Sequence, residues 1–115
     1  MSKGEKVTDS NQMKVMDKAE SVWSLYIIKT RLNTLYTGIS TDVGRRFKEH
    51  SGDSKKGARY LRGKGPLELV WQHRVDSKSQ ALMIENRIKK LNRQQKQNLI
   101  AGKIDPLSLL SEEQT

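Results

Sequence analysis

Two short runs of aromatic and β-branched residues, at positions 23–28 and 34–39, constrain the fold more than any other feature of this chain. Such runs, separated by a short polar connection, predict a β-hairpin. A three-residue connection that ends at Asn33, a residue that tolerates the left-handed conformation, places Tyr26 and Tyr36 on the same face. A two-residue connection would place them on opposite faces, because a change of register by one residue turns every side chain over.

Capping residues and apolar periodicity in the rest of the chain predict three helices and one more strand. These are a helix that begins after Ser40, Thr41 or Asp42 and runs to about His50, a strand at 67–72 after Pro66, a helix from Asp76 or Ser77 to about Leu91, and a short helix at 93–101 that ends at Gly102. The basic segment 55–65 is expected to be a loop with a helical turn near residues 58–61. Together these elements predict one α+β domain at residues 22–103, between a disordered arm (1–21) and an acidic tail (104–115).

The chain carries a net charge of +9, which is concentrated in the predicted domain. Residues 23–103 contain 18 basic and six acidic residues, a net charge of +12. This excess predicts a polyanionic partner, although lysines can also serve only to keep a small domain soluble. The expected nucleic-acid contacts come from two runs without acidic residues: Lys55, Lys56, Arg59, Arg62 and Lys64 in the first, and Lys89, Lys90 and Arg93 in the second.

Several classes of protein are excluded by what the sequence lacks. It contains no cysteine, so disulfides and thiolate metal sites are ruled out, and carboxylates and histidines are the plausible metal ligands. It has neither a run of about 18 apolar residues nor an apolar segment after its first lysines. A soluble cytoplasmic protein without a membrane partner is therefore expected.

Five polar residues lie beside predicted apolar positions rather than out in solvent: Tyr26, Tyr36, Arg46, His50 and Glu85. A guanidinium and phenol groups can bind a phosphodiester, an imidazole can transfer protons, and a carboxylate can bind a divalent metal. Each residue also has an ordinary structural interpretation, since tyrosines pack across hairpins, a histidine at a helix end contacts terminal carbonyls, and Glu85 can pair with Lys89. Their combined occurrence favours phosphodiester cleavage.

The order and spacing of these residues resemble those of the GIY-YIG nuclease superfamily. The resemblance rests on Leu25-Tyr26-Ile27, on Tyr36-Thr37-Gly38, on Arg46 and His50 at ten and fourteen residues after Tyr36, and on Glu85 in a later helix. It covers about residues 23–101 and is closest to the small stand-alone bacterial members of unknown role. The first triplet, Ser24-Leu25-Tyr26, lacks the glycine of the family and Thr37 replaces the usual isoleucine, but neither change removes a reacting group.

This resemblance implies a three-stranded antiparallel sheet flanked by helices. It also implies a metal-dependent endonuclease that hydrolyses DNA phosphodiester bonds, with branched or damaged DNA as the expected substrate and RNA as an alternative. Tyr26 is the implied general base, Tyr36 orients water or phosphate, Arg46 binds the scissile phosphate, His50 assists proton transfer, and Glu85 is the single protein ligand of Mg²⁺ or Mn²⁺. The alternative function is a non-catalytic nucleic-acid-binding module, or a subunit that acts with a protein partner in a larger repair assembly. The sequence leaves the oligomeric state open.

Overall fold

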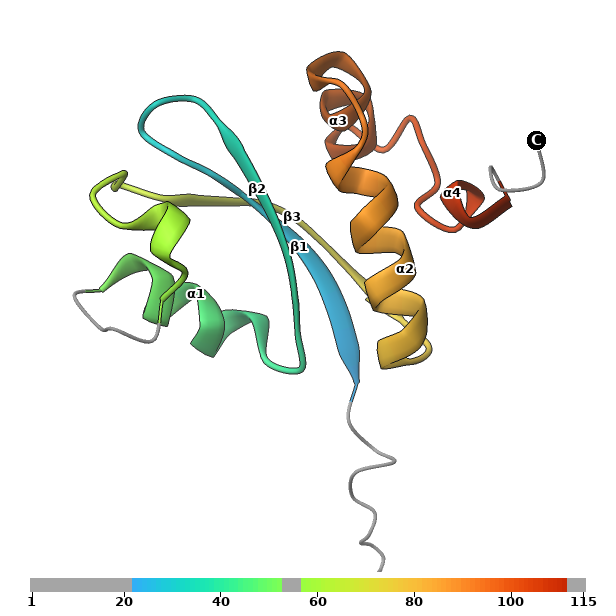
Figure 1. The fold of residues 1–115 in the computed structure, drawn as a ribbon, viewed down its shortest axis with the longest axis horizontal. Helices are drawn as coiled ribbons and strands as arrows, with labels where there is room; N and C mark the ends of the chain where they lie inside the picture. The colour runs from blue at the N-terminus through green and yellow to red at the C-terminus, as the bar shows by residue number, and fades with distance from the viewer. Residues whose placement is uncertain (1–21, 53–56, 112–115) are drawn as a thin grey trace, which may run out of the picture.

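Three antiparallel strands form the centre of the fold, with β1 (Trp23–Lys29) between β2 (Leu35–Ser40) and β3 (Glu68–Val75) (Figure 1). The computed structural model describes residues 22–52 and 57–111. Because β1 is the central strand, its residues 25–28 are all buried. The predicted α+β fold on a three-stranded antiparallel sheet is therefore confirmed, and the structure adds the strand order β2-β1-β3.

The hairpin of β1 and β2 has the register that a three-residue connection predicts. Asn33 has a φ of 65°, the left-handed conformation expected at the end of that connection. A backbone hydrogen bond of 2.9 Å from Thr30 to Thr34 closes the loop. The ring centroids of Tyr26 and Tyr36 are 6.5 Å apart, which confirms that the two phenols lie on the same face.

All three predicted helices are present, and each begins at a capping residue. The helical elements are α1 (Val43–Ser51), η3 (a 3₁₀ turn, Arg59–Leu61), α2 (Lys78–Lys89), α3 (Arg93–Ile100) and α4 (Ser108–Ser111). Of the alternatives at the start of α1, Asp42 is the cap, and its carboxylate accepts from the Arg45 N–H at 3.0 Å. At the start of α2, the Ser77 hydroxyl accepts from the Gln80 N–H at 3.1 Å. These caps satisfy backbone donors that a helix start leaves unpaired.

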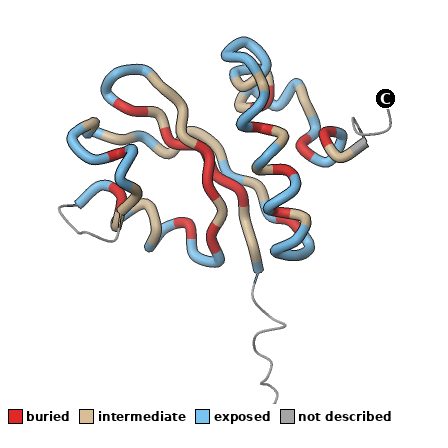
Figure 2. Tube along the Cα trace, in the orientation of Figure 1, coloured by how far each residue is buried: buried red, intermediate tan, exposed pale blue. Residues whose placement is uncertain are grey.

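One face of the sheet is covered by α2 and α3, to the right in Figure 1. Leu25 and Ile27 of β1 pack there against Ile84 and Ile88 of α2. Figure 2 shows buried segments in red along the strands and at intervals along α2. Leu109 of α4 is buried in the same cluster. Part of the segment expected to be an acidic tail therefore lies against the domain.

The other face of the sheet is covered by α1 and η3. Tyr26 and Ile28, which alternate with the residues above, pack there with Val43 of α1 and Leu61 of η3. The central strand is thus buried between two apolar clusters, and Tyr26 is part of the second one.

Some expectations fall on residues whose structure is not described. These are the disordered arm at residues 1–21, the two lysines Lys55 and Lys56, and the last four residues of the acidic tail. In the ranges 22–52 and 57–111, none of the helices is long and apolar enough to cross a lipid bilayer.

Candidate active site

Tyr26 extends its ring over the edge strand β2, where a glycine leaves room for it. Gly38 is the register partner of Tyr26. A β-carbon added to Gly38 would lie 2.6 Å from the ring carbon that carries the hydroxyl group, closer than real β-carbons approach other atoms. Gly38 does not have the left-handed backbone that is found at Gly63 and Gly102. The glycine of the second triplet is therefore required by the phenol ring and not by its own backbone angles.

We expect Gly38→Ala to lower the free energy of unfolding by about 1–3 kcal/mol, the usual effect of overfilling a packed position. Gly44→Ala is the matched control, because a β-carbon at Gly44 lies 3.8 Å from its nearest neighbour. Alanine is favoured over glycine in helices by up to about 1 kcal/mol, so this control is expected to be as stable as the wild type or more stable. Urea-induced unfolding measures both changes. Wild-type stability of Gly38→Ala would contradict the close approach of the Tyr26 ring.

His50 is buried beside Tyr26 and forms hydrogen bonds through both ring nitrogens. Its Nε2 lies 2.9 Å from the Tyr26 hydroxyl oxygen, and its Nδ1 accepts from the Ala58 backbone N–H at 3.0 Å. A neutral imidazole carries one N–H, and because Nδ1 is an acceptor here, the proton is on Nε2. His50 therefore donates to the oxygen of Tyr26 in this state and is not placed to accept the phenol proton. It fixes the phenol and directs the hydroxyl proton elsewhere.

Burial dominates the ionisation of both groups. Burial, followed by the neighbouring Tyr36, raises the pKa of Tyr26 to about 12, although Arg46 acts in the opposite direction. Burial, followed by the positive charge of Arg46, lowers the pKa of His50 below its ordinary value of 6.5. At neutral pH Tyr26 is therefore a phenol and His50 a neutral imidazole.

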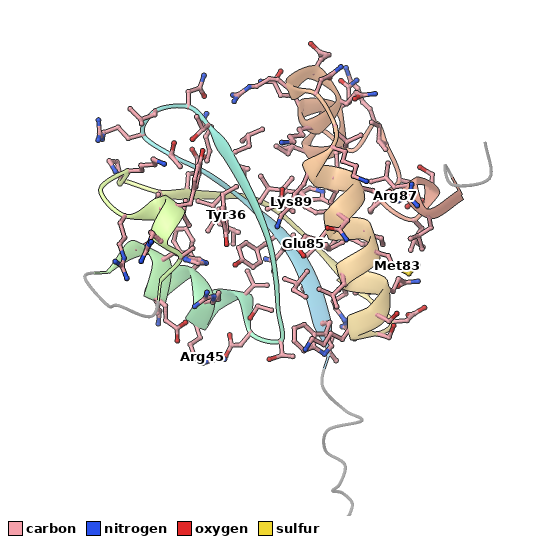
Figure 3. The ribbon with its side chains drawn as sticks, in the orientation of Figure 1. Tyr36, Arg45, Met83, Glu85, Arg87 and Lys89 are labelled. Atoms are coloured by element: carbon pink, nitrogen blue, oxygen red, sulfur yellow. The ribbon has the colours of Figure 1, made fainter. Side chains whose placement is uncertain are left out.

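Arg46 lies on the side of α1 that faces these residues. Its guanidinium donates to the Glu49 carboxylate at 2.8 Å, and this bond is the first reason that the pKa of Arg46 is raised. Arg46 also forms a hydrogen bond with Tyr26, which offsets part of the effect of burial on the pKa of that phenol. The next residue back, Arg45, points away from the sheet, and its side chain is 62% exposed (Figure 3). Only one of the two adjacent arginines therefore belongs to the site.

Tyr36 lies between three other aromatic rings. Its ring centroid is 6.5 Å from that of Tyr26, 5.6 Å from that of His50 and 5.8 Å from that of Tyr60. The ring of Tyr60, in η3, is nearly parallel to that of Tyr36, with an interplanar angle of 19°. The site therefore continues from the buried Tyr26 to the exposed Tyr60 through one line of aromatic side chains.

Glu85 approaches the same edge of the sheet from α2, on the opposite side from α1. Figure 3 shows Glu85 and Lys89 pointing from α2 toward β2 and Tyr36. The Glu85 carboxylate is close enough to Tyr26 to be among the causes that raise the pKa of that phenol, after burial and Tyr36. One of its oxygens lies 3.3 Å from the Lys89 ammonium, so the predicted helix-surface ion pair is formed. The five candidate residues thus come together at the β2 edge from both sides of the sheet.

Among the five candidate residues, one carboxylate, that of Glu85, is offered to a divalent cation, and the neighbouring Glu49 carboxylate is engaged by Arg45 and Arg46. Within the part of the chain that the structure describes, no group of three or more histidine, aspartate or glutamate side chains could hold a metal ion. Mg²⁺ usually keeps several waters and is bound by one or two carboxylates together with substrate phosphates. The donor set therefore fits a cation held jointly by Glu85 and a bound substrate, and does not fit one held tightly by the protein alone.

In the described part of the chain, Lys64, Lys89 and Lys96 lie beside Glu85 or the aromatic rings of the site. Lys89 is the ion-pair partner of Glu85, and the Nζ of Lys64 lies 3.5 Å from the centroid of the Tyr60 ring. Lys96 of α3 and Lys89 line a groove together with Tyr60. Lys64 and Lys89 were predicted as nucleic-acid contacts, and Lys96 was not.

Four more of the predicted contacts lie in the described ranges. Arg93 donates to the carbonyl and to the side-chain oxygen of Asn33, so it connects α3 to the hairpin loop. The other described members of the set are exposed: Arg59, Arg62 and Lys90.

The sequence contained signals for two further residues of the site, Gly38 and Tyr60, to which no role had been assigned. The predicted hairpin register already placed Gly38 opposite Tyr26, which indicates a close approach between ring and backbone. Tyr60 is the single aromatic residue in the basic segment 55–65, and an aromatic residue among unopposed cations is typical of single-strand binding surfaces.

The sequence matches the model of the family described as GIY-YIG catalytic domain over residues 22–98. Fold and site together define a domain of the GIY-YIG nuclease class, and the chain belongs to the GIY-YIG family. This result confirms the family that the residue spacing indicated.

The relatives are small bacterial proteins. A UPF0213 protein of Vibrio cholerae is 48% identical over 101 residues, which cover 85% of this chain and 98% of the relative. The UPF0213 protein YhbQ of Salmonella arizonae is 50% identical over 93 residues, covering 81% of this chain and 91% of the relative. The solution NMR structure of a UPF0213 protein from Bacillus halodurans has 37% identity, covers 79% of this chain and 95% of that chain, and has a TM-score of 0.47. The predicted likeness to the small stand-alone bacterial members is confirmed.

Proposed function

We propose that this protein is a divalent-metal-dependent endonuclease of the cytoplasm that hydrolyses phosphodiester bonds in branched or damaged DNA. The observation that supports this most is the meeting of Tyr26, hydrogen-bonded to His50, with Arg46 from one side of the sheet and Glu85 from the other. A phenol, a guanidinium and a carboxylate at one sheet edge supply a base, a phosphate ligand and a metal ligand. An ordinary hairpin surface has no need of this combination.

Tyr26 is the proposed base that takes a proton from the attacking water. Its own proton must leave first, and a pKa of about 12 opposes this in the free protein. The positive charge of Arg46 and the Nε2–H of His50 both favour the phenolate, because one attracts its charge and the other donates to its oxygen. Neutralising Glu85 removes a negative charge that raises the same pKa. Tyr26 therefore becomes a base only in the complete complex with substrate and cation.

Arg46 and Glu85 are the proposed ligands of the phosphate and the metal. The guanidinium presents a planar fork of donors to phosphate oxygens, and Glu49 holds that fork in place before a substrate arrives. Glu85 would hold Mg²⁺ or Mn²⁺, which when bound supplies positive charge to the phosphate and lowers the pKa of a bound water. Lys89, released from its ion pair with Glu85, would remain close enough to contact a phosphate.

A second candidate function is a nucleic-acid-binding module without catalysis, acting alone or with a protein partner. The observation that favours it is that both charged groups of the site are engaged within the protein, Arg46 with Glu49 and Glu85 with Lys89. The raised pKa of Tyr26 points the same way. This module would use the same basic surface on DNA or RNA.

Incubation with supercoiled plasmid, single-stranded DNA, branched DNA and RNA separates the two candidates. We expect cleavage of DNA with Mg²⁺ or Mn²⁺ and no cleavage when EDTA removes the cation, because Glu85 and the substrate bind the cation together. Agarose and denaturing gels measure nicks and cut positions. Binding of these nucleic acids without cleavage under any cation would support the module instead.

A further inference from the structure

A shallow groove beside the candidate site has one aromatic wall and one cationic wall. Its volume is about 340 Å³, within the range of sites for small ligands, and it is lined by Leu35, Tyr36, Thr37, Tyr60, Lys89 and Lys96. The aromatic wall is the pair Tyr36 and Tyr60, and the cationic wall comes from α2 and α3. Because Lys89 is paired with Glu85, the groove leads directly to the proposed metal ligand.

The exposed position of Tyr60 is fixed by the residues that flank it. Leu61, the next residue, is buried in the cluster beneath β1. The Arg31 side chain donates to the carbonyls of Gly63 and Gly65 at 2.9 Å each, which attaches this loop to the hairpin. Tyr60 itself is 46% exposed although it is a large aromatic residue. An aromatic ring that is held firmly and left in solvent is a surface ready for stacking.

We propose that Tyr60, supported by Tyr36, stacks on an unpaired base next to the scissile phosphate, and that Lys64, Lys89 and Lys96 bind the phosphates of that strand. Every base has a π-face, so a stacking platform with cations beside it binds single strands with little dependence on sequence. In a continuous duplex both faces of each base are covered by its neighbours. The groove therefore selects nucleic acids that present an unstacked nucleotide, such as single strands, flaps and bulges.

Lys64 is the group that such a base displaces. Its ammonium lies 3.5 Å from the centroid of the Tyr60 ring in the free protein. A cation–π contact at an exposed site is weaker than the stacking of a base on an aromatic ring, so the base replaces the ammonium. The displaced cation stays beside the bound nucleotide, where it can neutralise a phosphate.

This inference rests on the proposed function for its position beside a cleaved bond, but its test does not require cleavage. Single-stranded oligonucleotides with 2-aminopurine at successive positions are titrated with protein in EDTA. We expect quenching of the fluorescence at one position, and roughly 10- to 100-fold weaker binding by Tyr60→Ala, the range found for loss of one base–aromatic stack. Tyr60→Phe and Tyr60→Trp keep a ring and are expected to bind within about twofold of the wild type.

Two control substitutions distinguish the loss of base stacking from a general loss of folded structure. Tyr60→Leu keeps apolar bulk without a π-face and is expected to behave like Tyr60→Ala, whereas Leu82→Ala removes a comparably exposed apolar side chain from α2 and is expected to have no effect. Affinity for relaxed closed-circular duplex DNA, which has no ends, is expected to change less than twofold in all variants, since no free base face is offered. Circular dichroism confirms that each variant is folded.

The outcomes distinguish this inference from the proposed function. No quenching by the wild type, or equal quenching by Tyr60→Ala, overturns the stacking platform whether or not the protein cuts DNA. If quenching depends on Tyr60 but the protein cuts none of the four nucleic acids tested for cleavage, the stacking platform is supported. The endonuclease proposal is then overturned.

Discussion

Arg46→Ala is expected to slow DNA cleavage by about 10²- to 10³-fold, the usual effect of removing one donor to the charge that develops in a transition state. The guanidinium of Arg46 faces the Tyr26 phenol and is held by Glu49 at 2.8 Å, so its loss removes the proposed phosphate ligand and the cation that favours the phenolate. Arg46→Lys keeps the charge without the planar fork and is expected to recover only part of the rate. The wild type, Arg46→Ala and Arg46→Lys are compared by their initial rates of plasmid nicking with the enzyme in excess.

Arg45→Ala is the matched control for that experiment. Arg45 is adjacent in α1 and also contacts Glu49, at 3.4 Å, but it points to solvent (Figure 3). Both substitutions therefore remove an ion pair of the same carboxylate, and pairs of this kind contribute at most about 1 kcal/mol to stability. Similar melting temperatures with very different nicking rates would assign the effect to the site. Equal nicking rates for the two alanine variants would disprove the role of Arg46.

Glu85→Gln is expected to lower cleavage by roughly 10³-fold while leaving the fold and DNA binding intact, because a metal ion contributes several kcal/mol of transition-state stabilisation. Glutamine has the same shape but lacks the charge that a hard cation requires. The substitution also breaks the ion pair with Lys89, which as a helix-surface pair contributes only about 0.3–0.5 kcal/mol. Binding is measured by fluorescence anisotropy in EDTA, and cleavage by the nicking assay over a range of Mg²⁺ and Mn²⁺ concentrations.

Glu68→Gln provides the control for loss of one negative charge. Glu68 is exposed at the start of β3, on the opposite edge of the sheet from β2. We expect the Glu68→Gln variant to cut DNA at the wild-type rate. If Glu85→Gln retains that rate at every cation concentration, Glu85 is not the metal ligand and the metal-dependent proposal fails.

Local rules explain why so much of the fold was predictable. The hairpin register follows from a three-residue connection with Asn33 in the left-handed conformation, and both features are set within a few residues of sequence. The starts of α1 and α2 follow from Asp42 and Ser77 in the same way, because caps act on their own first turn. The strand order depends on contacts between distant segments, and the sequence pattern did not contain it.

The candidate site was likewise predictable only in part. Its members were predicted from their spacing, and the structure brings Tyr26, Tyr36, Arg46 and His50 to one side of β2 with Glu85 opposite. The tautomer of His50 was not predictable, because it is set by the N–H of Ala58 in a loop after α1. Burial also outweighs Arg46 in setting the pKa of Tyr26, and no spacing rule gives the degree of burial.

The central position of β1 determines which part of this domain opens last. A strand hydrogen-bonded along both edges and covered on both faces exchanges its amide hydrogens only when the whole domain opens. The backbone that carries the Tyr26 phenol therefore belongs to the last element to open, and contacts from His50 of α1 and Leu61 of η3 hold the ring against that strand.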